Sequence, residues 1–241
     1  METVSANLSL LDHSLLDNPI YNALGADQAG LALTSGRARR LPSYIGPLAG
    51  IPDQAAESYA DLRQLAFDGL PVGLFLTDPP EIPPGWTLLR GALMVQMICP
   101  QPPGEPQRPL QDAVMRQLTQ ADAPAMVELA RLTEPGPFHL RTMELGAFYG
   151  VFHGSSLVAM AGQRLSPPGF VEVSAVCTHP DVRGRGYAPL LMSTVMAEIF
   201  ARRKTPMLHS LAINDAAIAV YRRLGFAFRR NLHLAILAVQ P

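Results

Sequence analysis

The spacing of hydrophobic and polar residues divides the chain into alternating helices and strands. Apolar positions that recur on one face of a helix predict helices over 58–67, 120–132, 187–203 and 215–224. Short runs of apolar and β-branched residues predict strands over 72–77, 88–99, 110–118, 169–178, 206–213 and 232–239. Residues 146–165 are typical of a hairpin that turns at 153–155. This alternation, with an antiparallel hairpin inside it, predicts an α/β or α+β fold with a mixed sheet.

Proline divides the chain into two parts. Ten of the 23 prolines lie between Pro71 and Pro109, and the cluster "CPQPPGEPQRP" cannot form a regular helix or a central strand. We therefore place a boundary near residues 101–109. Residues 1–105 are predicted to form an N-terminal α/β region, and residues 106–241 a second domain.

Composition excludes several classes of protein. The chain is 48% hydrophobic and 16% charged, as globular proteins are, and its formal net charge is -1. That balance argues against a nucleic-acid partner, which would need a basic surface. Cys99 and Cys177 form no CxxC pair, so we expect neither a zinc site nor a disulfide framework. With no secretory signal and no apolar run of roughly 18 residues, we expect a cytoplasmic protein without a membrane partner.

A glycine-rich loop between the strand 169–178 and the helix 187–203 carries the clearest chemical signal. Gly184 and Gly186 lack Cβ atoms, so a ligand can approach the backbone closely. The amides from Gly184 to Ala188 come at a helix N-terminus, where unpaired N–H groups and the helix dipole attract anions. Arg183 and Arg185 add positive charge. The loop is therefore expected to hold a pyrophosphate.

A tight strand–helix turn without a ligand is a second interpretation of this loop. A dinucleotide-binding G-x-G-x-x-G loop is another, but its third glycine would fall at Pro189, and a hairpin precedes the loop where a parallel unit should begin. A Walker A loop needs G-K-[ST], which the segment lacks.

Two segments carry a family resemblance. "VCTHPDVRGRGYAPLL", followed by "LHSLAINDAAIAVYRRLGF", resembles the GNAT superfamily of N-acetyltransferases. The first segment is similar to its R/Q-x-x-G-x-G/A loop, in register at Arg183, Gly186 and Ala188. The second is similar to its N-x-x-A-x-x-x-Y-x-x-L-G-F signature, in register at Asn214, Ala217, Tyr221, Leu224, Gly225 and Phe226. The resemblance covers roughly residues 108–241.

The resemblance implies a GNAT-like mixed, splayed sheet flanked by helices, with the N-terminal α/β region in addition. A degenerate second copy of the fold, as in glycine N-acyltransferase-like proteins, is one interpretation of residues 1–105. The resemblance also implies acetyl-CoA, or another acyl-CoA, as the donor. Its pyrophosphate would lie on the loop, and its pantetheine arm along the preceding strand. The residues expected to hold it are Ala175, Val176, Cys177, Thr178, Arg183, Gly184, Arg185, Gly186, Tyr187, Ala188, Asn214, Ala217 and Tyr221.

Acyl transfer to an amine needs a deprotonated amine, a donor to the oxyanion and a proton for the leaving thiolate. The resemblance makes Tyr221 the acid for the CoA sulfur, with a core aromatic as the alternative. Glu172 is the candidate base, and on a half-buried strand we expect its pKa to rise; the alternative is a surface-facing strand glutamate. The N–H of Val176 or Cys177 is the candidate oxyanion donor. The Cys177 side chain is interpreted as a buried structural thiol.

The predicted function is N-acetyl or N-acyl transfer from acetyl-CoA to a primary amine, by direct attack through a tetrahedral intermediate. The acceptor, a small molecule or a peptide or protein amine, cannot be read from the sequence, and neither can the oligomeric state. The resemblance implies that the loop 133–146 sets the acceptor specificity. No metal is expected. The alternative is an acyl-CoA-binding sensor or scaffold that has the same fold but no turnover.

Overall fold

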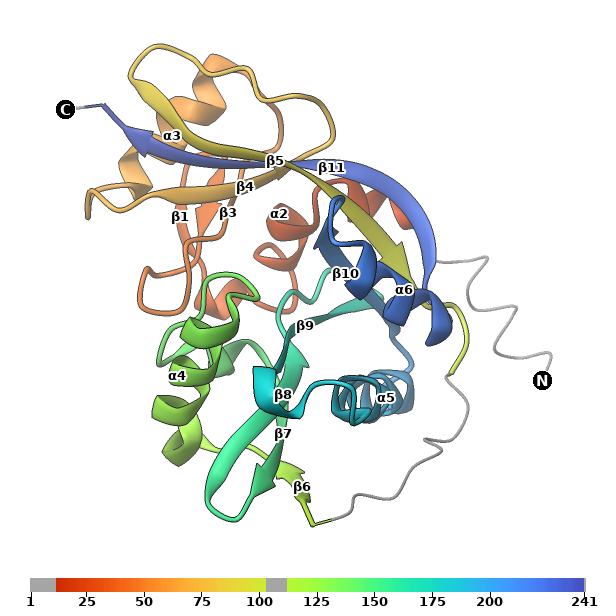
Figure 1. Ribbon diagram of the computed structural model, residues 1–241. Coiled ribbons are helices and arrows are strands. Elements are labelled where there is room, and N and C mark those ends of the chain that lie inside the picture. The colour runs from red at the N-terminus through yellow and green to blue at the C-terminus, as the bar shows by residue number, and fades with distance from the viewer. Residues whose placement is uncertain (1–11, 103–111, 241) are drawn as a thin grey trace.

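Eight strands form one mixed sheet in the computed structural model, which describes residues 12–102 and 112–240 (Figure 1). Adjacent strands are antiparallel except for one parallel pair, β10 and β9. The predicted mixed sheet is therefore confirmed. In order across the sheet, the strands are β4 (Val72–Leu76), β11 (Ala227–Val239), β5 (Trp86–Ile98), β10 (Thr205–Leu211), β9 (Phe170–Thr178), β8 (Ser156–Gln163), β7 (Phe148–His153) and β6 (Val114–Gln117).

Two helices cover opposite faces of the β7–β9 part of this sheet (Figure 1). α5 (Tyr187–Ala201) packs on one face through buried residues such as Leu191 and Val195. α4 (Ala123–Thr133) packs on the other through Met126 and Leu129. A shorter helix, α6 (Asp215–Arg223), joins the same core as α5. Both faces of the β7–β9 part are thus covered, and its apolar strands are buried between helices.

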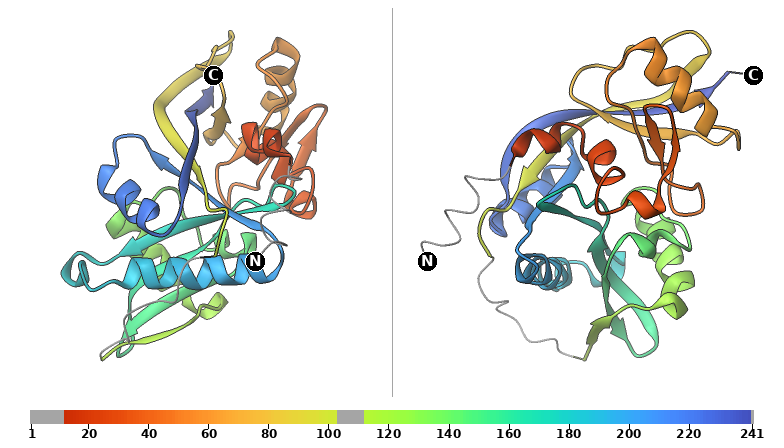
Figure 2. Two further views of the ribbon diagram at one scale, coloured as in Figure 1. Left: turned by 90° about the vertical axis from the view of Figure 1, so that its right-hand side faces the viewer. Right: turned by 180° about the vertical axis from the view of Figure 1, so that it is seen from behind.

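The N-terminal residues add a second layer against the far part of the sheet. Figure 2, from behind, shows the first short helices lying across the sheet and α3 near the ends of β5 and β11. A small sheet in the order β1-β2-β3 belongs to the same region. The remaining elements are η1 (His13–Asp17), α2 (Pro19–Ala23), η2 (Ala29–Leu31), β1 (Leu33–Ser35), β2 (Ala38–Arg40), β3 (Ala49–Gly50), α3 (Ala56–Leu65), η3 (Gln120–Asp122), η4 (Thr142–Leu145) and η5 (Pro180–Val182).

Strand β5 links the two parts of the chain. It precedes the proline cluster, yet it lies between β10 and β11, with Met97 opposite both Leu208 and Phe228. The sheet that carries the family motifs is thus completed by a strand from the N-terminal side. The division into residues 1–105 and 106–241 stays a prediction, and residues 103–111 of the predicted linker lie outside the described residues.

Strand β11 is longer than its sequence pattern predicts. The pattern indicates a strand from 232, whereas the structure begins β11 at Ala227, opposite Ile98 of β5. The extra residues, "AFRRN", include two arginines and do not alternate clearly. Because β5 offers a paired neighbour along its whole length, the partner strand rather than local propensity decides where β11 begins.

Candidate active site

The sheet opens between β9 and β10. These two strands are fully described, and they pair at three positions alone, from Phe170 opposite Thr205 to Glu172 opposite Met207. Beyond Glu172, β9 continues to Thr178 and β10 to Leu211 without facing each other in a ladder. The backbone of residues 173–178 therefore presents a free edge toward the gap. An extended ligand can pair with such an edge as an additional strand does.

A β-bulge marks the start of this free edge. Ser174 pairs with Gly162 and Cys177 with Met160, so Ala175 and Val176 together lie opposite one residue of β8. Ala175 has a φ of 51°, which is uncommon for a residue other than glycine. A bulge of this kind bends its strand and re-aims the neighbouring groups, and bulges are over-represented beside active sites.

The loop after β9 exposes unpaired amides, as the sequence predicts. Gly184 and Gly186 have φ values of 78° and 83°, and a Cβ added at either would meet no atom of the described residues beyond its chain neighbours within 4 Å. Gly186 is the N-cap residue of α5, and within the described residues the amides of 184–188 donate no hydrogen bond. Arg183 and Arg185 are exposed beside them. The loop therefore combines free donors, open space and positive charge, which suits a pyrophosphate.

Thr178 provides an independent indication of a missing polar partner. Its Oγ1 is buried, yet it forms no hydrogen bond within the described part of the chain. Thr178 ends β9, and its carbonyl oxygen accepts a hydrogen bond from Nε of Arg183 at 3.4 Å. A buried hydroxyl without a partner costs free energy. Its place between the free edge of β9 and the loop fits a polar group of a ligand that spans both.

Helix α6 brings the second motif to the same core. Asn214 caps the helix, with its side-chain oxygen accepting a hydrogen bond from the amide of Ala217 at 3.3 Å. Tyr221 is half-buried and packs against the cluster that contains Tyr187 and Leu191 of α5, with Val176 at its margin. The left view of Figure 2 shows α6 above the N-terminal end of α5. Burial, with a smaller effect of nearby Cys177, raises the pKa of Tyr221 to about 12, so its hydroxyl stays protonated at neutral pH.

Glu172 does not have the environment that the sequence suggests. Its side chain is fully buried, and its carboxylate accepts two hydrogen bonds from Arg164, at 2.8 and 2.6 Å. Nδ1 of His209 lies 2.7 Å from the same carboxylate. Although burial opposes ionisation, Arg164 and His209 lower the pKa of Glu172 to about 2. The predicted rise in its pKa is therefore wrong. Its role as base stays a prediction, which this low pKa does not support.

The ion pair continues into a buried chain of hydrogen bonds. The amide nitrogen of Gln96 lies 2.9 Å from Nε2 of His209 and donates to the carbonyl of Leu16. Its amide oxygen accepts from Arg229, which also binds Asp17 of η1. Because the Gln96 nitrogen is a donor, Nε2 of His209 accepts and Nδ1 carries the proton toward Glu172. The network fixes Arg164 and the point where the sheet opens.

Sequence reasoning missed Arg164, His209 and Gln96 as members of this site. One signal was available for Arg164. The segment "MAGQRLSPPGFVEV" puts one cation and one anion at facing positions of two antiparallel strands. The amide of Arg164 indeed donates to the carbonyl of Glu172 at 3.0 Å. His209 and Gln96 come together through long-range pairing of β10 with β5, which no local pattern predicts.

The other sequence expectations concern cysteine, metals and membranes. Cys177 is buried, and burial raises the pKa of its thiol to about 11, which fits a structural thiol. Residues 12–102 and 112–240 contain no cluster of three or more His, Cys, Asp or Glu side chains suited to a metal ion. Over the same residues, no helix has both the length and the apolar character to cross a membrane.

Comparison with known proteins decides the family. The model of the family described as FR47-like protein matches residues 148–234. N-alpha-acetyltransferase RimI of Mycobacterium tuberculosis is 36% identical over 120 residues, which are 45% of this chain and 75% of the relative. A crystal structure from Novosphingobium aromaticivorans, assigned to the GNAT family, is 40% identical with a TM-score of 0.85, and the match covers 95% of this chain and 100% of that one. The chain belongs to the GNAT superfamily of N-acetyltransferases.

The GNAT resemblance that the two sequence motifs carry is thus confirmed, and so is N-acetyltransferase function. A GCN5-related N-acetyltransferase from Kribbella flavida, 18% identical with a TM-score of 0.62, shares the fold over 90% of this chain and 95% of its own. This chain therefore shares its fold with that protein over nearly its whole length.

The buried Glu172 carboxylate gives a prediction for acid stability. Its pKa of about 2 in the folded GNAT protein lies below the ordinary value of 4.5, so its stabilisation is complete above about pH 4.5 and is lost as the pH falls toward 2. The shift corresponds to about 3 kcal/mol.

Denaturant unfolding of Glu172→Gln should show a lower free energy of unfolding at pH 7 than the unaltered protein, and a smaller loss of that free energy between pH 4.5 and 2. Glu128→Gln, an exposed change on α4, is the control. If the free energy of unfolding of Glu172→Gln falls as steeply between pH 4.5 and 2 as that of the unaltered protein, ionised Glu172 does not stabilise the fold in this way.

Proposed function

We propose that this GNAT protein transfers an acetyl group from acetyl-CoA to a primary amine, with CoA held along β9 and on the loop before α5. The observation that carries the proposal is that three features follow one another along the chain: the free edge of residues 173–178, the buried Oγ1 of Thr178, and the amides of residues 184–188. Neither that Oγ1 nor these amides have a hydrogen-bond partner among the residues that the structure describes. Pantetheine amides would pair with the strand edge, and the pyrophosphate would accept hydrogen bonds from the loop. Arg183 and Arg185 would add favourable charge.

The proposed chemistry needs no covalent intermediate on the protein. The amine lone pair attacks the thioester carbonyl, the C–S bond breaks, and the departing thiolate takes the hydroxyl proton of Tyr221. The raised pKa of Tyr221, about 12, keeps that proton available. The amide of Val176 in the bulge is the proposed donor to the oxyanion, because the bulge releases it from regular pairing with β8. Since Glu172 is fully engaged, we propose that the amine loses its proton to solvent.

Release of free thiol from acetyl-CoA in the presence of amines tests this function. An N-acetyltransferase releases one thiol for each acetylated amine, and mass spectrometry of the amine confirms the acetyl group. Binding of CoA without release on any amine would support the alternative, a sensor or scaffold with the GNAT fold. Failure to bind CoA in calorimetry would contradict both.

A further inference from the structure

The free edge of β9 has a direction, and this direction places the acyl end of a bound acyl-CoA. The loop 184–188 follows the C-terminal end of β9, whereas the opposite end of the free edge begins directly after Glu172, which pairs with β10. A CoA molecule with its pyrophosphate on the loop therefore extends its pantetheine arm toward Glu172. The thioester, at the end of that arm, then lies beside the bulge at Ala175 and Val176.

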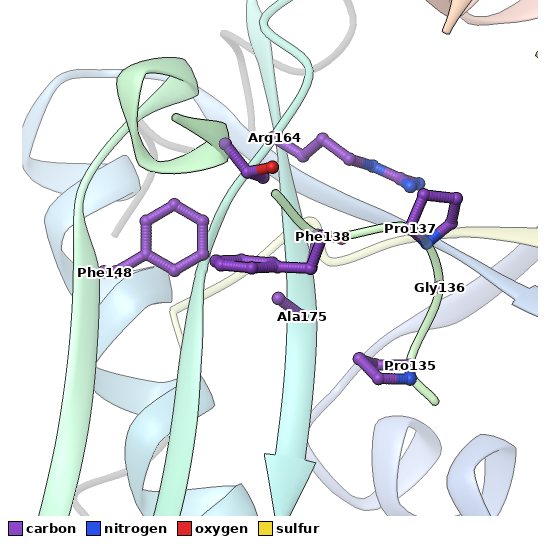
Figure 3. A pocket seen from close by; sticks show the side chains of 9 residues that line it. Pro135, Gly136, Pro137, Phe138, Phe148, Arg164 and Ala175 are labelled. Carbon is purple, nitrogen blue, oxygen red and sulfur yellow. The ribbon is translucent and has the colours of Figure 1, made fainter. Parts of the chain in front are cut away.

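A small cavity lies against this bulge. Its volume is about 10 Å³, which is room for about one water molecule and hence for a group of about methyl size. Figure 3 shows the ring of Phe138 beside that of Phe148, with Ala175 on the neighbouring strand. A thioester at the bulge can direct the end of its acyl group into this cavity. The lining residues used below are Pro137, Phe138, Phe148, Arg164, Ser174 and Ala175.

Phe138 closes the cavity from the side of the loop that follows α4. Residues 134–137 and 139–141 of this loop are exposed, whereas Phe138 is half-buried. Its ring packs against the cluster that contains Met126 of α4 and Met160 of β8. It meets Phe148 edge to face, with ring centroids 5.6 Å apart. The loop therefore directs this one ring inward, and the ring occupies the space into which a longer acyl chain would extend.

Phe148 forms a wall that cannot move away. It is fully buried on β7, where its ring lies against Gly162 of β8. A Cβ added at Gly162 would collide with that ring, so the ring already fills the space that a side chain of β8 would need. Because protein interiors are close-packed, a ring in this position has no free volume behind it. The cavity therefore cannot expand toward β8.

The loop that carries Phe138 is held at its other end. The amide of His139 donates to Oγ1 of Thr142 at 2.8 Å, and that hydroxyl donates to the carbonyl of Ile45 at 2.6 Å. Thr142 is buried, so the loss of these hydrogen bonds would leave polar groups without partners. A longer acyl group therefore cannot push Phe138 outward without a cost in free energy.

Arg164 adds a charged boundary to the same cavity. Its Nε and Nη2 donate to the carboxylate of Glu172, at 2.8 and 2.6 Å, and in Figure 3 its guanidinium extends toward Pro137. An alkyl chain that continued past the cavity would bring methylene groups against this guanidinium. Covering a charged group with apolar atoms costs free energy. Charge as well as volume thus restricts the length of the acyl chain.

We propose that Phe138, backed by Phe148, selects the acyl group of the CoA thioester: the acetyl methyl fits the cavity, and longer chains meet the Phe138 ring. The inference rests on the proposed function, because it names the residues that choose the acyl-CoA for the same transfer. One additional methylene group in an apolar site changes discrimination about 10- to 200-fold, so two should give a clear preference for acetyl over butyryl.

Binding of acyl-CoA analogues to the full chain tests the inference without requiring turnover. The probes are CoA and the dethia analogues of acetyl-CoA and butyryl-CoA, in which a methylene group replaces the sulfur so that no acyl group is released. Calorimetric titration should give a Kd for the butyryl analogue at least about tenfold higher than that for the acetyl analogue. Equal affinities would overturn the inference and leave the proposed function standing. If CoA itself does not bind, the proposed function fails, and the inference fails with it.

Replacement of Phe138 by alanine should remove this preference. The Kd for the butyryl analogue should fall about tenfold or more, while the Kd for CoA changes by less than about twofold. Phe138→Leu, which removes less of the wall, should give an intermediate ratio of the two Kd values. Phe67→Ala is the matched control, because it removes the same atoms from an exposed ring after α3, and it should keep the ratio of the unaltered protein. Thermal unfolding shows whether each variant is folded. An unchanged ratio in both folded Phe138 variants would show that Phe138 does not select the acyl group.

Discussion

Replacement of Tyr221 by phenylalanine is expected to lower kcat about 100-fold or more, the usual effect of losing a general acid, while the Kd for CoA changes by less than about twofold. The change removes the hydroxyl and keeps the ring. The ring packs against the α5 core, and its centroid lies 6.3 Å from the centroid of the Phe226 ring. Packing should therefore survive, and the effect should fall on the chemical step. Steady-state thiol release gives kcat, and calorimetric titration gives the Kd.

Tyr149→Phe is the matched control for this experiment. Tyr149 is also half-buried, and burial also raises the pKa of its hydroxyl, but that hydroxyl donates to Glu198 away from the motif. The control should keep kcat within about twofold. If Tyr221→Phe weakens CoA binding strongly and leaves kcat unchanged, Tyr221 is a binding residue, and the acid must be sought elsewhere.

Gly186→Val is expected to weaken CoA binding about 100-fold or more. Gly186 has a φ of 83°, which a β-branched residue adopts at a cost of about 1–3 kcal/mol. The added side chain would also occupy the open space beside the loop amides, since a Cβ at Gly186 approaches no other described residue beyond its chain neighbours within 4 Å. Strain and steric exclusion should act together on the pyrophosphate. Calorimetry with CoA measures the loss, and thermal unfolding reports the strain separately.

Gly69→Val separates these two effects. Gly69 has a φ of 69°, and a Cβ added there also meets no atom within 4 Å in the part of the chain that the structure describes, its chain neighbours aside. Gly69 lies after α3, outside both family motifs. The control should lose a similar amount of stability and keep its affinity for CoA. If both variants bind CoA equally well, the pyrophosphate does not lie on the loop before α5.

The local parts of the site could be predicted from the sequence because their geometry is local. Gly184 and Gly186 have the positive φ values that glycine tolerates, and the loop has the free amides that the sequence predicts. Asn214, the first residue of the second motif, caps α6. These features depend on residues within a few positions of one another. The second motif is also local, because its residues follow one another along α6. The structure places Tyr221 of this motif against the core beside α5.

The long-range parts could not be predicted in the same way. The pKa of Glu172 depends on Arg164 and on His209, and His209 reaches Glu172 because β10 pairs in parallel with β9. Gln96 joins the network because β5, from the other side of the proline cluster, lies next to β10. The sequence alone does not predict the pKa of a carboxylate on a buried strand. Burial raises that pKa, whereas a cation buried beside the carboxylate lowers it, and in Glu172 the second effect is larger.

A crystal structure of the chain in complex with CoA would show directly whether the cofactor lies along β9 and on the loop before α5. We expect pyrophosphate oxygens within hydrogen-bond distance of amides in 184–188, the pantetheine arm along residues 175–178, and the sulfur near the hydroxyl of Tyr221. We also expect Oγ1 of Thr178 to gain a polar partner. CoA bound away from the opening between β9 and β10, or bound there with its pyrophosphate off the loop, would show that this binding site is wrong.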